Sequence, residues 1–439
     1  MAVHLGRLLP SFAARNPLVP KSQLSTKLSV SCSATNHSVK FKRDYTSVMI
    51  VPTGIGAAIG GFAGDALPVA RALSSVVDCL ITHPNVLNAA MLYWPMPNVL
   101  YVEGHALDRF AEGLWALKPV HQNKDHGCTA VSDMNQVGLV LDAGIEEDLR
   151  IRHLQVADAV RASLGLPVVE YIVTDTPLEV EKWVDPKNGQ STGRLKHPDS
   201  LLRAVQTLVS RSGVNAIAVV GRFPDDDDAE GTDNYRQGMI GHHYFLVPAT
   251  TLKGIDLLAG VEAVISHLVV QEFQIPCAHA PACSPFLLSI SLSPKSAAEE
   301  LGHTFLPCVL AGLSNAPQYL VKNNDSLEKG CILASDIDSV ILPIDACGGD
   351  GALAFARIKR NKPLIITVEE NETVLNDTPD KLGIEAVQVS NYWEAIGVIA
   401  AHKAGIDPHS LRRTRINNIP CNSSLLANGN VFSSIMPIT

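Results

Sequence analysis

The amino-acid sequence predicts an α/β fold, built from largely parallel sheets with covering helices. Short apolar runs alternate with helix-like runs along the chain, which is typical of that architecture. The short runs are apolar throughout, as expected for strands that are buried on both faces of a sheet. Two glycine-rich segments, 53–65 and 345–351, each connect a predicted strand to a predicted helix. We therefore expect two glycine-rich strand-turn-helix units within the fold.

The apolar runs and the periodic runs locate the individual elements. Strands are predicted at residues 47–52, 98–102, 136–141, 168–174, 216–220, 339–344 and 363–368, with a further strand-like run at 78–82. Helices are predicted at 146–164, 199–211, 352–357 and 392–404. Two long polar segments, 185–197 and 224–241, are predicted to be loops, and loops of that length are usually functional or disordered.

Residues 1–43 have the composition of a transit peptide. They contain seven Lys or Arg residues, no Asp or Glu, and frequent Ser and Thr. The small residues Val30–Ala34 resemble a plastid processing site. We predict delivery to the chloroplast stroma, with the mitochondrion as the alternative. A basic tail without any targeting role is a further interpretation.

The rest of the chain is strongly acidic. The whole sequence has 35 basic and 44 acidic residues, so removing the seven basic residues of the leader leaves 28 against 44, a formal charge of −16. Such a body argues against nucleic acid as a partner, because phosphate backbones require basic surfaces. No apolar run is long enough to cross a bilayer; the best candidate, 257–270, contains Glu262 and His267.

We predict an α/β body over 44–410 and an irregular tail over 411–439. Two subdomains with a boundary near 185–240 are one alternative. The sequence leaves open whether the chain forms a homo-oligomer.

The first glycine-rich turn is a candidate anion-binding site. Glycine lets backbone N–H groups approach a ligand, and the following helix N-terminus favours negative charge. The spacing matches neither the dinucleotide-binding fingerprint nor a nucleotide P-loop. The alternative is a tightly packed turn without a ligand. The candidate ligand-binding residues here are Thr53, Gly54, Gly56, Gly60, Gly61 and Asp65.

Polar residues follow the next two predicted strands. His83, Asn85 and Asn88 follow the run 78–82, and Glu103 and His105 follow the run 98–102. Because ligands collect at the carboxyl ends of parallel strands, we expect these residues to face one edge. His83, Glu103 and His105 are the candidates for proton transfer. Each of them, taken alone, is also compatible with a structural role in a loop.

The second glycine-rich turn repeats the pattern. Its candidate residues are Asp345, Gly348, Gly349 and Asp350, followed by Glu370 and Asn371 after the next strand. Carboxylates here could coordinate Mg²⁺ or bond a ligand hydroxyl, although Asp350 could instead cap the helix. Cys347 could be a nucleophile or a packed thiol. No other cofactor is indicated.

A cysteine–histidine segment and an arginine complete the candidates. Cys277, His279 and Cys283 could bind zinc, with His267 or Cys308 as a fourth ligand, but the spacing is not that of a standard zinc site. Cys277 and His279 could also form a nucleophile–base pair. A proline-bounded loop is the favoured interpretation. Arg236 is a candidate clamp for an anion.

Several segments resemble one family of plastid and cyanobacterial proteins, grouped as domain of unknown function 3326. The resemblance rests on VPTGIGAAIGGFAGDALP, THPNVLNAA, GVEAVISH, IPCAHAPA, ACGGDGALAFARI and VEENETVL, and it spans about residues 46–406. It implies a plastid location. It implies no reaction and no site residues.

The function expected from these features is that of a stromal enzyme acting on a small anionic metabolite, which bears phosphate or carboxylate and binds at the glycine-rich turns. The alternative is a non-catalytic plastid factor that binds a metabolite or an assembly partner. A metal-dependent hydrolase using Cys277, His279 and carboxylates is a third interpretation. The enzyme interpretation loses support if the polar side chains of the turns are used in internal hydrogen bonds.

Overall fold

A computed structural model describes most of the chain beyond the predicted leader. The described residues are 44–62, 64–87, 96–120, 134–224, 255–256, 258–282, 294, 305–321 and 330–413. Residues 1–43 form a unit separate from 44–439 and lie outside the described part, as do 414–439. The predicted transit peptide and most of the predicted tail therefore stay predictions.

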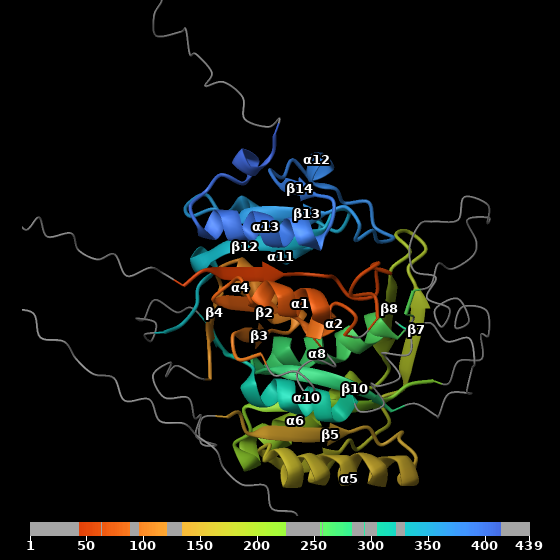
Figure 1. Ribbon diagram of the computed structural model, residues 1–439. Coiled ribbons are helices and arrows are strands. Elements are labelled where there is room, and N and C mark those ends of the chain that lie inside the picture. Colours follow the sequence, from red (N-terminus) through yellow and green to blue (C-terminus); the bar gives the residue numbers. More distant parts are fainter. Residues whose placement is uncertain are drawn as a thin grey trace, which may run out of the picture. The chain divides into compact units, whose positions relative to one another are not determined.

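The first sheet has six parallel strands and uses both ends of the described chain (Figure 1). In spatial order they are β14 (Val387–Val389), β13 (Leu364–Val368), β12 (Ile337–Pro343), β1 (Thr46–Met49), β2 (Cys79–Thr82) and β3 (Val99–Tyr101). Strand order runs outward in opposite directions from the central pair β12 and β1. That pair is a topological switch point, where α/β proteins commonly bind ligands.

The second sheet has four parallel strands from the middle of the chain. They are β10 (Cys277–Ala282), β9 (Ala216–Arg222), β5 (Val137–Leu141) and β6 (Val168–Val173). Two antiparallel pairs accompany the sheets: β4 (Trp115–Lys118) with β11 (Gln318–Val321), and β7 (Val180–Val184) with β8 (Ser191–Leu195). The α/β fold with largely parallel sheets is confirmed.

The helices of the described residues are α1 (Leu67–Ser74), α2 (Pro84–Leu87), α4 (Gly104–Ala111), α5 (Glu147–Leu164), α6 (Pro198–Ser212), α8 (Ala259–Phe273), α10 (Phe305–Asn315), α11 (Asp350–Arg357), α12 (Pro379–Leu382) and α13 (Tyr392–Lys403), with 3₁₀ turns η3 (Ala334–Asp336) and η4 (Pro408–Leu411). The four predicted helices correspond to α5, α6, α11 and α13, and the described residues form further helices that were not predicted. Glycines in the left-handed conformation end α5 and α6, at Gly165 and Gly213.

Three hydrophobic cores order these elements into layers. One core joins α1 and α13 to one face of the first sheet. A second core lies between the sheets and contains apolar residues of α4, α11, α6 and α8. A third joins α5 and α10 to the far face of the second sheet. In Figure 1, α8 accordingly lies between the strands of the two sheets.

Two local predictions were wrong. The segment 276–283 was predicted to be a loop, but Cys277–Ala282 forms β10. Its Pro281 is tolerated because β10 is at the edge of the second sheet, where one side needs no N–H donor. The segment 185–197 was predicted to be a long loop, but Ser191–Leu195 forms β8 and pairs with β7.

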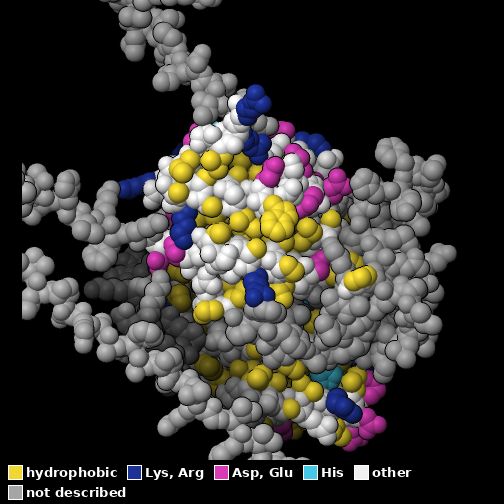
Figure 2. Space-filling model, in the orientation of Figure 1, with side chains coloured by type: hydrophobic (Ala, Val, Ile, Leu, Met, Phe, Trp, Pro, Cys, Tyr) yellow, Lys and Arg dark blue, Asp and Glu magenta, His cyan; other side chains and the backbone are white. Residues whose placement is uncertain are grey.

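The chain changes from the first sheet to the second between β3 and β5, and returns between β10 and β12. The subdomain boundary predicted near 185–240 falls within the segment that builds the second sheet and stays a prediction. Within the described residues, no helix is long and apolar enough to span a membrane. On the face shown in Figure 2, Lys and Arg side chains lie apart among acidic and apolar ones.

Candidate acid–base site

Glu103 is a buried carboxylate at the start of α4. It follows β3 directly, and its extended backbone conformation places it at the N-cap of the helix. Its Oε2 accepts hydrogen bonds from the backbone N–H of His105 at 2.8 Å and of Ala106 at 3.3 Å. The residue is only 1% exposed. The helix N-terminus thus provides both the donors and the positive potential that stabilise this buried charge.

His267 of α8 is the partner of Glu103 across the two layers. Its Nδ1 donates to Oε1 of Glu103. The imidazole side chain is 44% exposed, whereas the carboxylate side chain is 2% exposed. Gly104 makes this approach possible, because a Cβ there would lie 2.9 Å from Cε1 of His267. A buried carboxylate therefore orients an imidazole that faces solvent.

The two histidines of this site have pKa values moved in opposite directions. Burial lowers the pKa of His267, but the charge and hydrogen bond of Glu103 outweigh it, so the pKa lies above its ordinary value. Burial lowers the pKa of His105 and outweighs the effect of Glu103. The two ring centroids are 6.4 Å apart. Neighbouring groups whose pKa values diverge in this way can act as an acid and a base.

Aromatic residues form one side of the site. The ring of Trp115 meets His105 edge-on at 5.8 Å between centroids and stacks on Tyr319 at 5.7 Å. The hydroxyl of Tyr319 accepts a hydrogen bond from the backbone N–H of Glu103 at 3.2 Å. These contacts fix both the ring of His105 and the strand end that carries the carboxylate.

Asp108 connects this site to the second glycine-rich turn. Its Oδ1 accepts a hydrogen bond from the backbone N–H of Gly351, in the first turn of α11, at 2.8 Å. Burial raises the pKa of Asp108 to about 6, although this hydrogen bond lowers it. A Cβ on Gly351 would lie 2.7 Å from the same oxygen. The N-terminus of α11 therefore already holds a carboxylate of the protein itself.

Of the remaining residues of the second turn, some contact other parts of the protein and others are exposed. Asp345 accepts from the N–H of Thr373 at 2.9 Å and from its hydroxyl at 2.8 Å. Gly348 packs against Asp377, whose carboxylate would clash with a side chain there. Gly349 and Asp350 are exposed, and a Cβ on Gly349 would meet nothing within 4 Å.

Cys347 is buried, and burial raises the pKa of its thiol to about 12. That value is the opposite of what an activated nucleophile needs.

The first glycine-rich turn is held by internal hydrogen bonds. Asn371, which is 0% exposed, accepts from the N–H of Ile59 at 2.8 Å and donates to its carbonyl at 2.9 Å. The N–H of Gly60 donates to Asp65 at 2.5 Å. The carbonyl of Gly54 accepts from the N–H of Ser191 at 2.8 Å, which ties the turn to β8.

The other residues of the first turn also face protein. The carbonyl of Thr53 accepts from Gln190 at 3.3 Å. A Cβ on Gly56 would lie 3.1 Å from Ile255, and a Cβ on Gly61 would overlap the carbonyl oxygen of Ala57. These glycines therefore allow close packing of the backbone.

The segment 371–374 fills the space between the two turns. In addition to the Asn371 and Thr373 bonds, the N–H of Val374 donates to the carbonyl of Ile55 at 2.9 Å. Glu370, just before this segment, accepts from the N–H of Tyr392 at the start of α13 at 3.1 Å. The switch point between β12 and β1 is therefore occupied by the protein's own chain.

His83 has a structural role in the first turn, although the charges of Glu103 and His267 also act on it. Its Nε2 accepts a hydrogen bond from the backbone N–H of Val51 at 2.9 Å. The residue is 5% exposed, and burial lowers its pKa to about 4. The structure thus brings Glu103 and His105 together with His267, and uses His83 to hold the first turn.

The cysteine–histidine segment has different partners from those considered in the sequence. Nδ1 of His279 lies 2.6 Å from the hydroxyl of Ser266, and its Nε2 lies 3.5 Å from Glu262. Cys277 is fully buried and burial raises the pKa of its thiol well above the usual value. Among the described residues, no three His, Cys, Asp or Glu side chains are arranged to hold a metal ion.

Four candidates cannot be placed. Asn88, Arg236 and Cys283 lie outside the described residues, as does the side chain of Asn85.

The sequence interpretation missed the pairing of Glu103 with His267, since His267 was considered only as a zinc ligand. Its signal was that His267, like Glu262, interrupts the apolar run 257–270.

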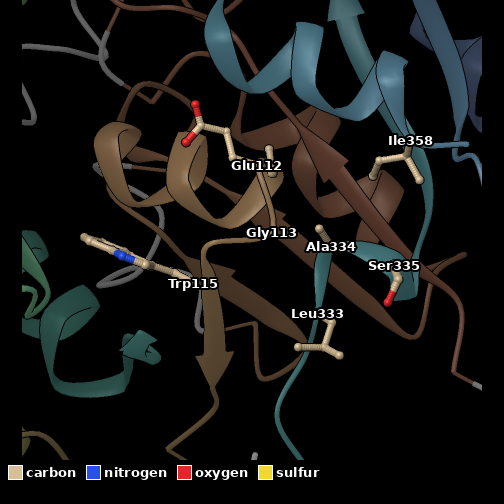
Figure 3. A pocket seen from close by; sticks show the side chains of 8 residues that line it. Glu112, Gly113, Trp115, Leu333, Ala334, Ser335 and Ile358 are labelled. Carbon is tan, nitrogen blue, oxygen red and sulfur yellow. The ribbon is translucent and has the colours of Figure 1, made fainter. Parts of the chain in front are cut away.

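A pocket of about 190 Å³ lies at the C-terminal end of α4, whereas Glu103 and His105 are at the N-terminal end of this helix. Figure 3 shows Glu112 and Gly113 on one side and Leu333, Ala334 and Ser335 on the other. Trp115 also contributes to the lining, but its indole extends away from Ser335. Trp115 thus contributes to the pocket and also contacts the ring of His105.

The fold and the site define an α/β protein with a histidine–carboxylate pair between two parallel sheets. The chain belongs to the family of proteins of unknown function designated DUF3326, which matches residues 46–412. An uncharacterized lipoprotein of Synechococcus sp. is 52% identical over 370 residues, covering 84% of this chain and 94% of the relative. No solved structure matches the chain.

Proposed function

We propose that this protein is an enzyme that uses acid–base catalysis on a small anionic metabolite. The observation that carries the proposal is the pairing of the buried Glu103 carboxylate with the partly exposed imidazole of His267. A carboxylate behind Nδ1 fixes the orientation of the ring and directs Nε2 outward. The opposite ring nitrogen is then available to a ligand.

The two histidines have complementary roles in this proposal. His267, with its raised pKa, is the proton donor, and His105, with its lowered pKa, is the proton acceptor. Between the two pKa values both residues are in the form that each role requires. Activity is therefore expected to be bell-shaped in pH, with a plateau between these values.

The anionic character of the substrate follows from the positions of the charges. When His267 is protonated, it carries a positive charge on a partly exposed side chain, while Glu103 is buried behind it. A ligand anion can approach the imidazolium without meeting the carboxylate directly. The glycine-rich turns contribute less to this proposal than the sequence suggested, because Asn371, Asp65 and Asp108 already use several of their amides.

We infer that the protein works in the chloroplast stroma. The acid-free, basic leader and the Synechococcus relative support this location. The full chain fused to a fluorescent protein should collect in chloroplasts, and a version lacking residues 1–43 should not. Accumulation of the full chain in mitochondria would contradict the chloroplast assignment.

A thermal-shift screen tests the enzymatic proposal. The purified chain is heated with individual carboxylates, sugar phosphates and nucleotides, since a ligand that binds the folded state raises its melting temperature. Compounds that raise it are then incubated with the protein, and conversion is followed by NMR. We expect at least one small anion to bind and to be converted.

Three variants show whether the effect belongs to this site. His267→Gln and Glu103→Gln should abolish conversion, because each removes one half of the pair. His153→Gln is the matched control, since among the described residues His153 bonds to the carbonyl of Leu149 within α5, at 2.8 Å. Conversion that persists in the His267→Gln variant would exclude this site as the catalytic one.

A non-catalytic assembly factor is the second candidate. It is favoured by large apolar side chains exposed near the end of the described chain: Trp393 is 83%, Leu411 is 65% and Ile406 is 45% exposed. Exposed apolar side chains mark a protein-binding surface where they form one contiguous patch. The same screen separates the two functions, because an assembly factor should give no shift that depends on His267.

A further inference from the structure

The hydroxyl of Tyr101 is a buried polar group without a hydrogen-bond partner among the described residues. Tyr101 ends β3, two residues before Glu103, and is 4% exposed. Its hydroxyl oxygen is sealed from solvent. Leaving a buried hydroxyl unpaired destabilises a folded protein, so nearly all such groups in native structures have a partner.

The hydroxyl of Tyr319 lies in the same region and uses only its acceptor capacity among the described residues. It accepts from the N–H of Glu103, and no acceptor for its own hydrogen is found among the described residues. The pKa values of Tyr101 and Tyr319 are both raised, first by burial and then by nearby charges that include Glu103 and Cys277. The two hydroxyls therefore remain protonated and are available as donors.

We propose that the hydroxyls of Tyr101 and Tyr319 form a binding position for the carbonyl oxygen of the ligand, beside the Glu103–His267 pair. A carbonyl oxygen has two lone pairs and can accept both hydrogen bonds at once. This inference rests on the proposed function, and it specifies the substrate class as a carbonyl compound that also bears an anionic group.

The oxygen bound here is uncharged because of its surroundings. Burial raises the pKa values of Tyr101, Tyr319 and Cys277, and the negative charge of Glu103 raises them further. The same field would repel a carboxylate or phosphate oxygen placed among these groups. The anionic group of the ligand therefore lies on the other side of Glu103, toward the exposed imidazole of His267.

The first test needs no ligand. Tyr101→Phe keeps the ring and removes the unpaired hydroxyl, so the melting temperature should stay equal or rise. Tyr392→Phe is the matched control: that residue is also 4% exposed, but its hydroxyl accepts from Asn371 at 2.8 Å, so its removal should lower the melting temperature. A comparable loss in Tyr101→Phe would show an internal water only, and would overturn the proposal.

The second test uses matched pairs of probes. 2-Oxoglutarate is compared with glutarate, and dihydroxyacetone phosphate with glycerol 3-phosphate, since the members of each pair differ at the carbonyl. Wild type should bind the carbonyl member of at least one pair more tightly. Tyr101→Phe should weaken that binding by about tenfold, the effect of one lost hydrogen bond, and should leave the other member unaffected.

The outcomes separate this inference from the proposed function. If both members of a pair bind equally well and both lose affinity in His267→Gln, the acid–base site stands and the carbonyl position is wrong. If Tyr101→Phe binds the carbonyl member as wild type does, the carbonyl position is likewise wrong. If no probe in either pair shows carbonyl-dependent binding, the inference falls, whatever other anion the wider screen identifies.

Discussion

Two regions at the carboxyl edge of the first sheet use similar residue types in different ways. At the centre of the sheet, the glycine-rich turns after β1 and β12 are joined through buried side chains, of which Asn371 is 0% exposed. At the end of the sheet, after β3, Glu103 is equally buried, but its partner His267 has a side chain that is 44% exposed. The second region therefore pairs a buried carboxylate with a partly exposed imidazole.

This difference shows how a ligand-binding motif can become a packing device. Backbone N–H groups at a glycine turn need acceptors, whether these come from a ligand or from the protein. Here Asn371, Asp65 and Asp108 supply them, so the central turns resemble sites with internal ligands. Substitutions in the central turns should therefore change the stability of the fold. Substitutions in the region after β3 should mainly change the pKa of His267.

The largest effect is expected for Asn371→Ala. The substitution leaves the N–H and carbonyl of Ile59 and the hydroxyl of Tyr392 without their buried partner. The free energy of unfolding should fall by about 3 kcal/mol, because each lost buried bond costs about 1 kcal/mol or more. Urea unfolding at pH 7.5 measures this change.

Asn376→Ala provides the control for that change. Asn376 lies in the same loop but is exposed, and it bonds Lys381 at the surface. Its substitution should change stability by about 0.5 kcal/mol or less. Equal, small effects of the two substitutions would show that Asn371 does not hold the turn, and would break the comparison at its first region.

A comparable effect should appear in the pH dependence contributed by His83. Burial lowers its pKa from 6.5 to about 4, so the unfolded chain binds this proton more tightly than the folded one. Its contribution to stability is complete above pH 6.5 and is lost as the pH falls toward 4. The loss should amount to about 3 kcal/mol, at about 1.4 kcal/mol per pH unit.

His83→Gln isolates this contribution. Glutamine keeps an acceptor for the N–H of Val51 but cannot titrate, so the loss of stability between pH 7.5 and 4.5 should be smaller than in wild type. His197→Gln is the control, since that side chain is 42% exposed and its ring remains in contact with water. Identical pH dependence in wild type and His83→Gln would mean that His83 is not desolvated as the structure shows.

The sequence was sufficient for most of the fold. Buried parallel strands such as β12 are continuous apolar runs, and helices such as α6 show clear periodicity, so both were predicted correctly. The errors arose where composition misled. Pro281 suggested a loop because proline cannot donate within a sheet, and only the assembled sheet shows that β10 is an edge strand.

The candidate site was predictable only in part. Glu103 and His105 follow a strand, and that local position was enough to select them. Their partner His267 is 164 residues away in the chain and lies in an apolar helix of the second core layer. No local sequence pattern predicts the pairing of Glu103 with His267, because it depends on how α8 packs against α4. Likewise, glycines that pack against backbone and glycines that bind a ligand have the same sequence signature.

The smallest effect, and the most specific to the site, is expected for Gly104→Ala. The new methyl group would lie 2.9 Å from Cε1 of His267, so the partly exposed ring must move away from Glu103. Stability should change by about 1 kcal/mol or less, because alanine favours the helix by about that amount. The pKa of His267 should fall, since the charge of Glu103 is what raises it against burial. NMR titration of the histidine ring protons measures this shift.

Gly349→Ala is the control at the N-terminus of α11, where a Cβ meets nothing within 4 Å, and it should leave the pKa of His267 unchanged. If neither variant alters that pKa, Glu103 does not control the protonation of His267, and the two regions no longer differ in the way that the acid–base proposal requires.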